Sequence, residues 1–333
     1  MRILFIGSKY LGSNARSLLE AFQDLDHEVF SLDPGQFFPY RHDMSNRIAQ
    51  KFSIDEFHLS TSQKMFNFIE RQFNLNSFDL LFVFRGVNIP PDLLNAFRGL
   101  KAHFHPDDSS NVENRSHLFD LTESLYDVHF TPKKLNVSEI KVRTNNSNVH
   151  FIWYAYDPRI HKAMVADYGN GVGFIGNRRP DRIELVKSLS GRYGKEFFLA
   201  GQKWKRNLDI VLKAQVSGFV SGHEYQELLR RAPIQLGLLN SDNRDTHTAR
   251  SFEIPAAGGL FLGEDTDEHR TLFTSWENAV LFENETDLFE KIDFLRKKEH
   301  LLHKIRKQGE KLMVSGGNTW KDRASKMLVQ IVK

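Results

Sequence analysis

Short apolar runs that end in a glycine and lead into amphipathic helices constrain this chain's fold most strongly. The first, RILFIG (2–7), has the length of one buried strand, and ARSLLEAFQDL (15–25) carries apolar residues at helical spacing. The run HEVFSLD (27–33) is predicted to be the next strand. A strand, a glycine turn, a helix and a second strand form a βαβ unit, whose strands lie parallel in a sheet covered by helices.

The same alternation continues to about residue 155. The section 40–75 is predicted to be helical, and PPDLLNAF (90–97) opens a further helix at a proline. The runs predicted as further strands are FDLLFVFRG (78–86), AHFHPDD (102–108), YDVHFTP (126–132) and the stretch 148–155.

The pattern lapses over 156–171 and then restarts. The strands predicted after this seam are GVGFIG (171–176), KEFFLAG (195–201), IQLGLLN (234–240), GLFLG (259–263) and NAVLFEN (278–284), followed by a basic helical tail over 286–333. We therefore expect an α/β protein with two Rossmann-like, doubly wound domains, which face each other across a cleft at the carboxyl ends of their strands. The expected ranges are 1–160, 161–315 and a final helix, 316–333, that crosses back to the first domain after the break Ser315-Gly316-Gly317.

Composition excludes several classes of site. The chain has no cysteine, which rules out disulfides, thiolate metal sites and cysteine nucleophiles. The apolar runs are too short for a membrane span, and the first is too short for a signal sequence, so we expect a cytoplasmic protein and leave peripheral association with the inner membrane face open. The net charge of +3 is spread along the chain, which argues against a nucleic-acid partner.

The stretch HTARSFEIPAAGG (247–259) is the most informative candidate site. A proline is tolerated in the first turn of a helix, so Pro255 predicts a helix that begins near 250–252 and ends at Gly258 and Gly259. Its amino end follows the strand 234–240, and unsatisfied N–H groups at such an end attract phosphate. Arg250 adds a bidentate partner for the same phosphate.

Two acidic residues accompany this arginine. Glu253 has the chemistry to accept hydrogen bonds from a ribose diol, and Asp245 lies on the loop before the helix, where it faces a sugar. The alternative is a plain surface ion pair between Arg250 and Glu253 at i,i+3 spacing, and the sequence leaves both interpretations open. The turn after strand 171–176 is a second candidate for approach to a phosphate, and Lys203-Trp204 offers a cation and an aromatic face.

The chain resembles the CgeB-like (spore maturation protein B-like) glycosyltransferases. The segment LLNSDNRDTHTARSFEIPAAGGLFLGEDTDEHRTLF carries most of the resemblance. In the first half it is carried by FHPDDSSNVENRS (104–116), YDVHFTPKKLNVSEI (126–140) and WYAYDPRIHK (153–162). The resemblance implies a GT-B fold and transfer of a sugar from a nucleotide diphosphate sugar, a co-substrate, with no other cofactor and no metal.

The resemblance also implies roles for single residues. Glu253 corresponds to the ribose carboxylate and Asp245 to the sugar-side acid, where this chain has Asp in place of the family's Glu. Arg250 is similar in placement to a pyrophosphate contact. Asp265-Thr266-Asp267 has metal-ligand spacing, but we interpret it as a surface loop. The other residues expected to contact the donor are Gly176, Arg178, Ser251 and Gly258.

The first domain is expected to bind the acceptor. Gly7, Tyr10 and Gly12 lie on its first loop, whose G-x4-G lacks the Lys-Ser/Thr ending of an NTPase phosphate loop. Arg85 either contacts an anionic acceptor or braces the cleft. The candidate bases for an acceptor hydroxyl are His105, Asp107 and Asp108, although Asp-Asp-Ser-Ser is also good turn and helix-cap chemistry.

Together these features predict a glycosyltransferase that acts on a glycan or other hydroxyl acceptor in cell-surface or spore-coat polysaccharide assembly. Two alternatives share the nucleotide site: a GT-B sugar-nucleotide epimerase and a non-catalytic scaffold that binds a nucleotide sugar. The sequence does not identify the donor, the acceptor, the stereochemistry or the oligomeric state.

Overall fold

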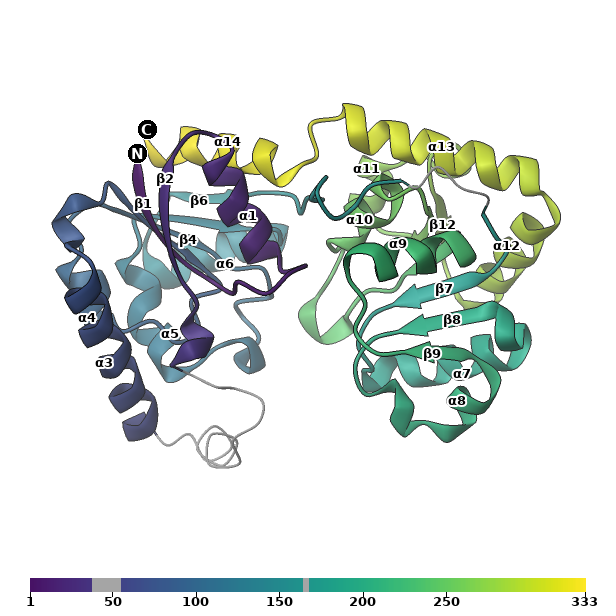
Figure 1. The fold of residues 1–333 in the computed structure, drawn as a ribbon, viewed down its shortest axis with the longest axis horizontal. Helices are drawn as coiled ribbons and strands as arrows, with labels where there is room; N and C mark the ends of the chain where they lie inside the picture. The colour runs from purple at the N-terminus through teal and green to yellow at the C-terminus, as the bar shows by residue number, and fades with distance from the viewer. Residues whose placement is uncertain (38–54, 164–167) are drawn as a thin grey trace. The chain divides into compact units, whose positions relative to one another are not determined.

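A computed structural model describes residues 1–37, 55–163 and 168–333. The chain divides into two compact units, one made of Met1–Trp153 with Trp320–Lys333 and the other of Tyr154–Thr319. The predicted seam at 156–171 thus begins just after the point where the chain enters the second unit. Each unit is built around its own sheet (Figure 1).

The first unit holds a six-stranded parallel sheet in the order β2-β1-β3-β4-β5-β6. Its strands are β1 (Arg2–Ile6), β2 (Glu28–Leu32), β3 (Leu80–Phe84), β4 (Leu100–Phe104), β5 (Val128–Thr131) and β6 (Val149–Phe151). Its helices are α1 (Asn14–Gln23), α3 (Asp55–Gln72), α4 (Pro91–Ala96), α5 (His117–Thr122), α6 (Lys134–Thr144) and α14 (Trp320–Ile331). The helix predicted over 40–75 is present as α3, and the part before residue 55 lies outside the described residues.

Aromatic side chains fill one side of this sheet. The rings of Phe5 and Phe82, from neighbouring strands, stack with centroids 5.6 Å apart, and Phe22 of α1 meets Phe82 edge-on. Helix α14 packs along α1 and buries Trp320 against Phe104. The last helix of the chain is therefore part of the first unit's core.

The second unit holds another six-stranded parallel sheet, in the order β12-β11-β10-β7-β8-β9. Its strands are β7 (Val172–Ile175), β8 (Phe197–Ala200), β9 (Gln215–Ser217), β10 (Ile234–Gly237), β11 (Leu260–Glu264) and β12 (Val280–Phe282). Its helices are α7 (Ile183–Tyr193), α8 (Leu208–Lys213), α9 (Gly222–Arg231), α10 (Arg250–Ala256), α11 (Asp267–Leu272), α12 (Glu285–Lys297) and α13 (Glu299–Ser315).

The predicted fold class is confirmed: strands alternate with helices along the chain, and the strands form two parallel sheets. Strand β9 was not predicted, because it is only three residues long and half exposed. The basic tail forms α12, α13 and α14, with the predicted break at Ser315-Gly316-Gly317. Among the described residues, none of the helices has the length and apolar character to cross a membrane.

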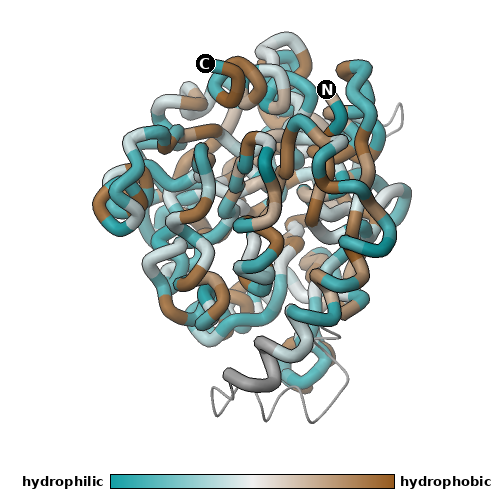
Figure 2. Tube along the Cα trace, turned by 90° about the vertical axis from the view of Figure 1, so that its left-hand side faces the viewer, coloured by the Kyte–Doolittle hydropathy of each residue, from teal (hydrophilic) through white to brown (hydrophobic). Residues whose placement is uncertain are grey.

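Hydropathy follows this layering. Hydrophobic and hydrophilic stretches alternate along the tube in Figure 2, as the amphipathic helices require. Both sheets have nearly uninterrupted buried strands, for example Leu80–Phe84 and Leu260–Glu264. Strands buried on both faces are typical of parallel sheets covered by helices, and they present their loops at the carboxyl edge.

Candidate functional site

Two loops interlock at the carboxyl edge of the second unit's sheet. One follows β7 and contains Arg182, and the other follows β10, the neighbouring strand. The Arg182 guanidinium donates to the carbonyls of Leu238 and Leu239, each at 3.0 Å. The hydroxyl of Ser241 donates to the Asp181 carboxylate at 2.9 Å. These contacts fix both loops next to each other where the strands end.

A second guanidinium joins the first at this edge. Arg250 donates from Nη2 to the same Leu238 carbonyl at 3.0 Å, and from Nη1 to the Ile175 carbonyl at 3.2 Å. Both guanidinium groups lie over the Phe174 ring, with the Arg182 carbon at 5.3 Å and the Arg250 carbon at 5.7 Å.

This pair of cations concentrates positive charge. Over the part of the chain that the structure describes, no carboxylate lies within ion-pair distance of either guanidinium, and the Nε atom of each is buried without a partner. Burial, and then the charge of Arg250, lowers the pKa of Arg182 to about 10. A site with two cations and no paired anion is suited to bind a diphosphate.

Glu253 lies one turn along α10 from Arg250. Its Oε1 is 3.8 Å from Nε2 of His161, and its side chain is 15% exposed. The Asp157 N–H donates to Nδ1 of His161 at 3.2 Å, so the ring's proton is on Nε2, facing Glu253. Burial, and then the charge of Glu253, raises the pKa of the neighbouring Tyr225 hydroxyl. The carboxylate is therefore largely enclosed, with acceptor capacity remaining for a ligand's hydroxyls.

The prediction that Pro255 lies in the first turn of its helix is wrong. Helix α10 begins at Arg250, so Pro255 is its sixth residue. It is tolerated because the helix ends one residue later, and the missing N–H removes a single backbone hydrogen bond. The predicted end at the glycine pair is confirmed, since Gly258 has φ +82° just after the cap residue Ala257.

The predicted free N–H groups at the start of α10 are mostly occupied. The N–H groups of Ser251, Phe252 and Glu253 donate to the carbonyls of Thr248 and Ala249 at 2.9–3.0 Å. The preceding residues already turn helically, which supplies these acceptors. Positive charge at this edge therefore comes mainly from the two arginines.

The other four residues predicted to contact the donor do not all lie near Arg250. Gly176 is adjacent to Arg250, since a Cβ atom built on it would lie 3.2 Å from Nη1 of that arginine. Arg178 is on the same loop, and its Nε donates to Asn207 at 2.6 Å. Ser251 is fully buried and hydrogen-bonds His269 at 2.9 Å. Gly258 lies at the opposite end of α10, about 10 Å from its start by helical rise, and its carbonyl accepts from Arg306.

Asp245 braces its own loop. Its Oδ2 accepts from the backbone and side-chain N–H groups of Asn240, at 3.1 and 2.7 Å, and its Oδ1 accepts from Asn243 at 2.8 Å. This arrangement uses both carboxylate oxygens to hold the loop after β10. The predicted sugar-side role of Asp245 stays a prediction, while the geometry assigns it this bracing role.

Two other sequence interpretations have structural outcomes. Trp204 is fully buried and donates to the Gly176 carbonyl at 2.7 Å, so it offers no aromatic face to a ligand. Asp265 and Asp267 both pair with Arg270, at 2.8 and 2.9 Å, and Thr266 caps α11. Within the described ranges, no three His, Asp or Glu side chains are grouped as metal ligands.

A buried polar network connects α10 to the end of β11 and to α11. His247 contacts Glu268 at 2.6 Å, and His269 contacts Ser251 through Nε2 and the Glu264 carbonyl through Nδ1. Burial lowers the pKa of His269 to about 4, so it is neutral near pH 7. Glu264 accepts the Leu239 N–H at 2.7 Å, and burial raises its pKa.

In the first unit, Arg85 and Asp107 come together at the carboxyl edge of β3 and β4. Arg85 Nε lies 3.6 Å from Asp107 Oδ2, and both side chains reach solvent. Arg85 has φ +72°, a left-handed conformation that costs a non-glycine residue roughly 1–2 kcal/mol. An exposed ion pair contributes about 0–1 kcal/mol, so this one does not clearly offset that cost.

The other two candidate bases are buried. His105 is fully buried, contacts the Asp107 carbonyl through Nδ1 at 2.9 Å, and has a pKa lowered by burial to about 4. Asp108 accepts from the Ser110 N–H at 3.0 Å and from the Asn136 amide at 2.8 Å, so it caps the turn after β4. Of the three, only Asp107 presents a carboxylate to solvent.

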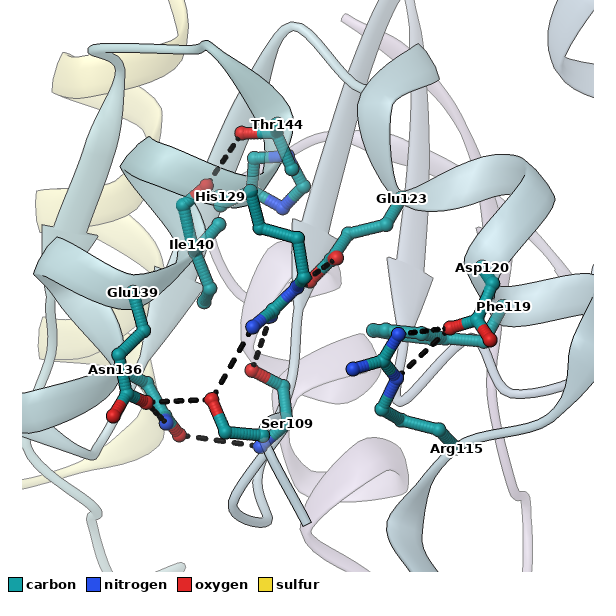
Figure 3. Close-up of polar contacts among 12 residues, drawn as sticks. Ser109, Arg115, Phe119, Asp120, Glu123, His129, Asn136, Glu139, Ile140 and Thr144 are labelled. Atoms are coloured by element: carbon teal, nitrogen blue, oxygen red, sulfur yellow. Dashed lines mark hydrogen bonds and ion pairs between the residues drawn. The ribbon is translucent and has the colours of Figure 1, made fainter. Parts of the chain in front are cut away.

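The loop that carries Asp107 is anchored from α6. Ser109 donates its N–H to Asn136 and accepts from Arg143, which also pairs with the buried Glu123 (Figure 3). This network holds the backbone that follows β4 in place.

The three candidates on the first loop of this unit differ in environment. Gly7 is closely packed, since an added Cβ atom would lie 2.8 Å from the Phe5 ring. Gly12 has a left-handed backbone conformation with φ +88°, and the Tyr10 side chain is exposed.

Sequence reasoning missed Arg182, His161 and Tyr225. Arg182 follows Arg178 and Arg179 within five residues, and residue type alone does not distinguish which of the three is buried. His161 was noticed only as part of a family segment. The signal that would have found Arg182 is its place after Pro180, at the start of the helix that follows β7.

Comparison with known proteins finds a family likeness for most of the second unit together with part of α14. Residues 178–329 match a family model described as glycosyl transferase-like. That region is therefore similar to a glycosyl transferase-like domain. It contains Arg182, Arg250 and Glu253 together. A search of curated proteins finds no match to the chain.

Solved structures with the same fold extend over both units. HepE from Anabaena, in complex with UDP-glucose, is 11% identical, with 99% of each chain covered and a TM-score of 0.68. An α-glucosyltransferase in complex with UDP and a DNA containing an HMU base is 13% identical, with 100% of each chain covered and a TM-score of 0.66. TarM is 10% identical with a TM-score of 0.59; the match covers 80% of this chain and 57% of TarM. The chain therefore has the fold of the GT-B glycosyltransferases.

Proposed function

We propose that this protein transfers a sugar from a nucleotide diphosphate sugar to an acceptor hydroxyl. The observation that carries the proposal is the pair Arg182 and Arg250, two cations without a carboxylate partner among the described residues. They lie at the carboxyl edge of the sheet within the glycosyltransferase-like region. Ligands of doubly wound folds bind at this edge.

In this proposal the donor's diphosphate contacts Arg250, the buried Arg182 adds positive charge beside it, and the Glu253 carboxylate accepts hydrogen bonds from the ribose hydroxyls. HepE and the α-glucosyltransferase have each been solved with a uridine nucleotide. We therefore take a UDP-sugar as the first donor to test.

During transfer, the bond between the sugar's anomeric carbon and the diphosphate oxygen breaks, and its electron pair leaves with the nucleotide diphosphate. The acceptor oxygen bonds to the anomeric carbon and loses its proton to a base. Arg182 and Arg250 stabilise the negative charge that develops on the leaving group. The proposed reaction uses no metal and no further cofactor.

The narrower assignment is to a CgeB-like enzyme of cell-surface or spore-coat glycan assembly, at work in the cytoplasm. It rests on the sequence resemblance. The acceptor stays open: the α-glucosyltransferase of the same fold was solved with DNA, and HepE was solved with UDP and glucose.

Incubation with a panel of UDP-, GDP-, ADP- and dTDP-sugars tests the proposal. We expect one donor to raise the unfolding temperature and to be hydrolysed slowly, with release of free nucleotide diphosphate. No thermal shift and no hydrolysis with any donor would overturn it. An altered sugar on an intact nucleotide would identify an epimerase instead, and binding without any turnover of donor or acceptor would identify a scaffold.

A further inference from the structure

Arg85 occupies a backbone conformation that suits glycine. It has φ +72° and is followed by Gly86 with φ +67°, so the chain makes two successive left-handed residues where β3 ends. Glycine adopts this region without steric cost, whereas a residue with a Cβ atom is strained there. A glycine at position 85 would therefore satisfy the backbone at lower cost than the arginine does.

Buried contacts impose this conformation. The Arg85 N–H donates to the Phe104 carbonyl at 2.7 Å, and Nε2 of His103 contacts the Arg85 carbonyl at 3.1 Å. Burial, and then the charge of His105, lowers the pKa of His103 to about 3, so the ring is neutral and donates from Nε2. His105 contacts the Asp107 carbonyl through its Nδ1 at 2.9 Å. Each buried ring thus fixes the backbone of one residue of the exposed pair.

The contacts that the Arg85 side chain makes within the protein do not explain why an arginine occupies this position. Its side chain is 56% exposed, and within the described residues its ion-pair partner is Asp107, at 3.6 Å. A long, exposed ion pair of this kind adds little to stability. The planar fork of an arginine is suited to two-point contact with an oxyanion, and a strained residue held rigidly at a strand's carboxyl edge is typical of a ligand contact.

We propose that Arg85 binds an oxyanion on the acceptor, which is a sugar or glycan that carries a phosphate or carboxylate group. Asp107 orients the guanidinium from one side and leaves its other N–H groups for the ligand. This inference rests on the proposed function, because it names the chemical class of that reaction's acceptor.

The variant Arg85→Gly separates binding from folding. We expect its unfolding temperature to be at least as high as that of the wild type, because glycine relieves the left-handed strain. Binding is measured by titration calorimetry with three probes: glucose 6-phosphate, glucuronate and glucose. The wild type should bind at least one anionic probe more tightly than glucose, and Arg85→Gly should lose about 10-fold or more of that affinity. The phosphate and carboxylate probes identify which oxyanion is preferred.

Two matched variants control this test. Asp26→Gly relieves a second left-handed residue, φ +60°, in the turn before β2, and Arg98→Ala removes another exposed cation of the same unit. Both should leave binding of the anionic probes unchanged. Equal affinity of the wild type for all three probes, or an Arg85→Gly protein whose affinity for the anionic probes is unchanged, would overturn the proposal. Donor hydrolysis by the wild type without acceptor tests the proposed function separately.

Discussion

At the scale of single residues, the charges on α10 have distinct partners. The sequence allowed Arg250 and Glu253 to form a surface ion pair, but Arg250 donates to two carbonyls and Glu253 lies beside His161. Among the described ion pairs, none joins Arg250 to Glu253. A mostly buried carboxylate that is not used to neutralise the nearest arginine is better explained by a ligand than by solubility.

Replacement of Glu253 by alanine tests its contact with ribose. We expect Glu253→Ala to weaken UDP binding by about 1–3 kcal/mol, since hydrogen bonds to a charged acceptor contribute roughly that much. Titration calorimetry with UDP measures the change. Glu277→Ala removes an exposed carboxylate of the same unit and should leave the affinity unchanged. Equal affinity of Glu253→Ala and the wild type would refute the ribose role.

At the scale of elements, two glycines inside helices lead to opposite predictions for their replacement by alanine. Gly309 in α13 packs so closely on the Asn278 carbonyl that an added Cβ would lie 2.5 Å from its oxygen. Gly191 in α7 is exposed, and an added Cβ would meet nothing within 4 Å. The close approach of α13 to the segment before β12 thus depends on Gly309.

We expect Gly309→Ala to destabilise the protein although alanine is the better helix former, because the backbone carbonyl cannot yield cheaply. Gly191→Ala is the matched control and should stabilise by roughly 0.5–1 kcal/mol through helix propensity alone. Urea unfolding of the two variants and the wild type measures both effects. A stabilised Gly309→Ala protein would show that α13 can shift away from the Asn278 carbonyl.

At the scale of the whole molecule, both units contain buried neutral histidines. Burial lowers the pKa of His103 to about 3 and of His105 and His269 to about 4, whereas an unfolded chain has a histidine pKa near 6.5. Between these values the unfolded state binds more protons than the native state. These histidines therefore leave the free energy of unfolding unchanged above pH 6.5 and lower it as the pH drops from 6.5 toward 4.

Each such histidine contributes at most about 1.4 kcal/mol per pH unit in this window. The urea midpoint measured between pH 7 and pH 4.5 should fall steadily, and His103→Gln should reduce the steepness of the fall. His300→Gln replaces an exposed histidine of α13 and should leave it unchanged. A urea midpoint that does not depend on pH across this window would show that these rings can be protonated in the folded protein without loss of stability.

Local pattern in the sequence predicted most of the fold. Continuous apolar runs marked eleven of the twelve strands found among the described residues, since β9 was missed, and the glycine pair at 258–259 marked the end of α10. These features depend on neighbours in the sequence: strand burial, helical periodicity and backbone conformation at glycine. The helix begins at Arg250, as the sequence predicts, but Pro255 is its sixth residue and not part of its first turn, because a proline is also tolerated where the helix ends one residue later.

The sequence by itself determined the alternation of parallel strands and helices, and it picked out Arg250 and Glu253. Tertiary structure decided which other residues join them. Strand order places β10 beside β7, about sixty residues apart, so that Arg182 meets Leu238 and Asp245 is left to brace its loop. It also buries Trp204 and holds Arg85 in a left-handed conformation through His103. Periodicity is a local property, whereas these contacts depend on which loops each sheet brings together at its own carboxyl edge.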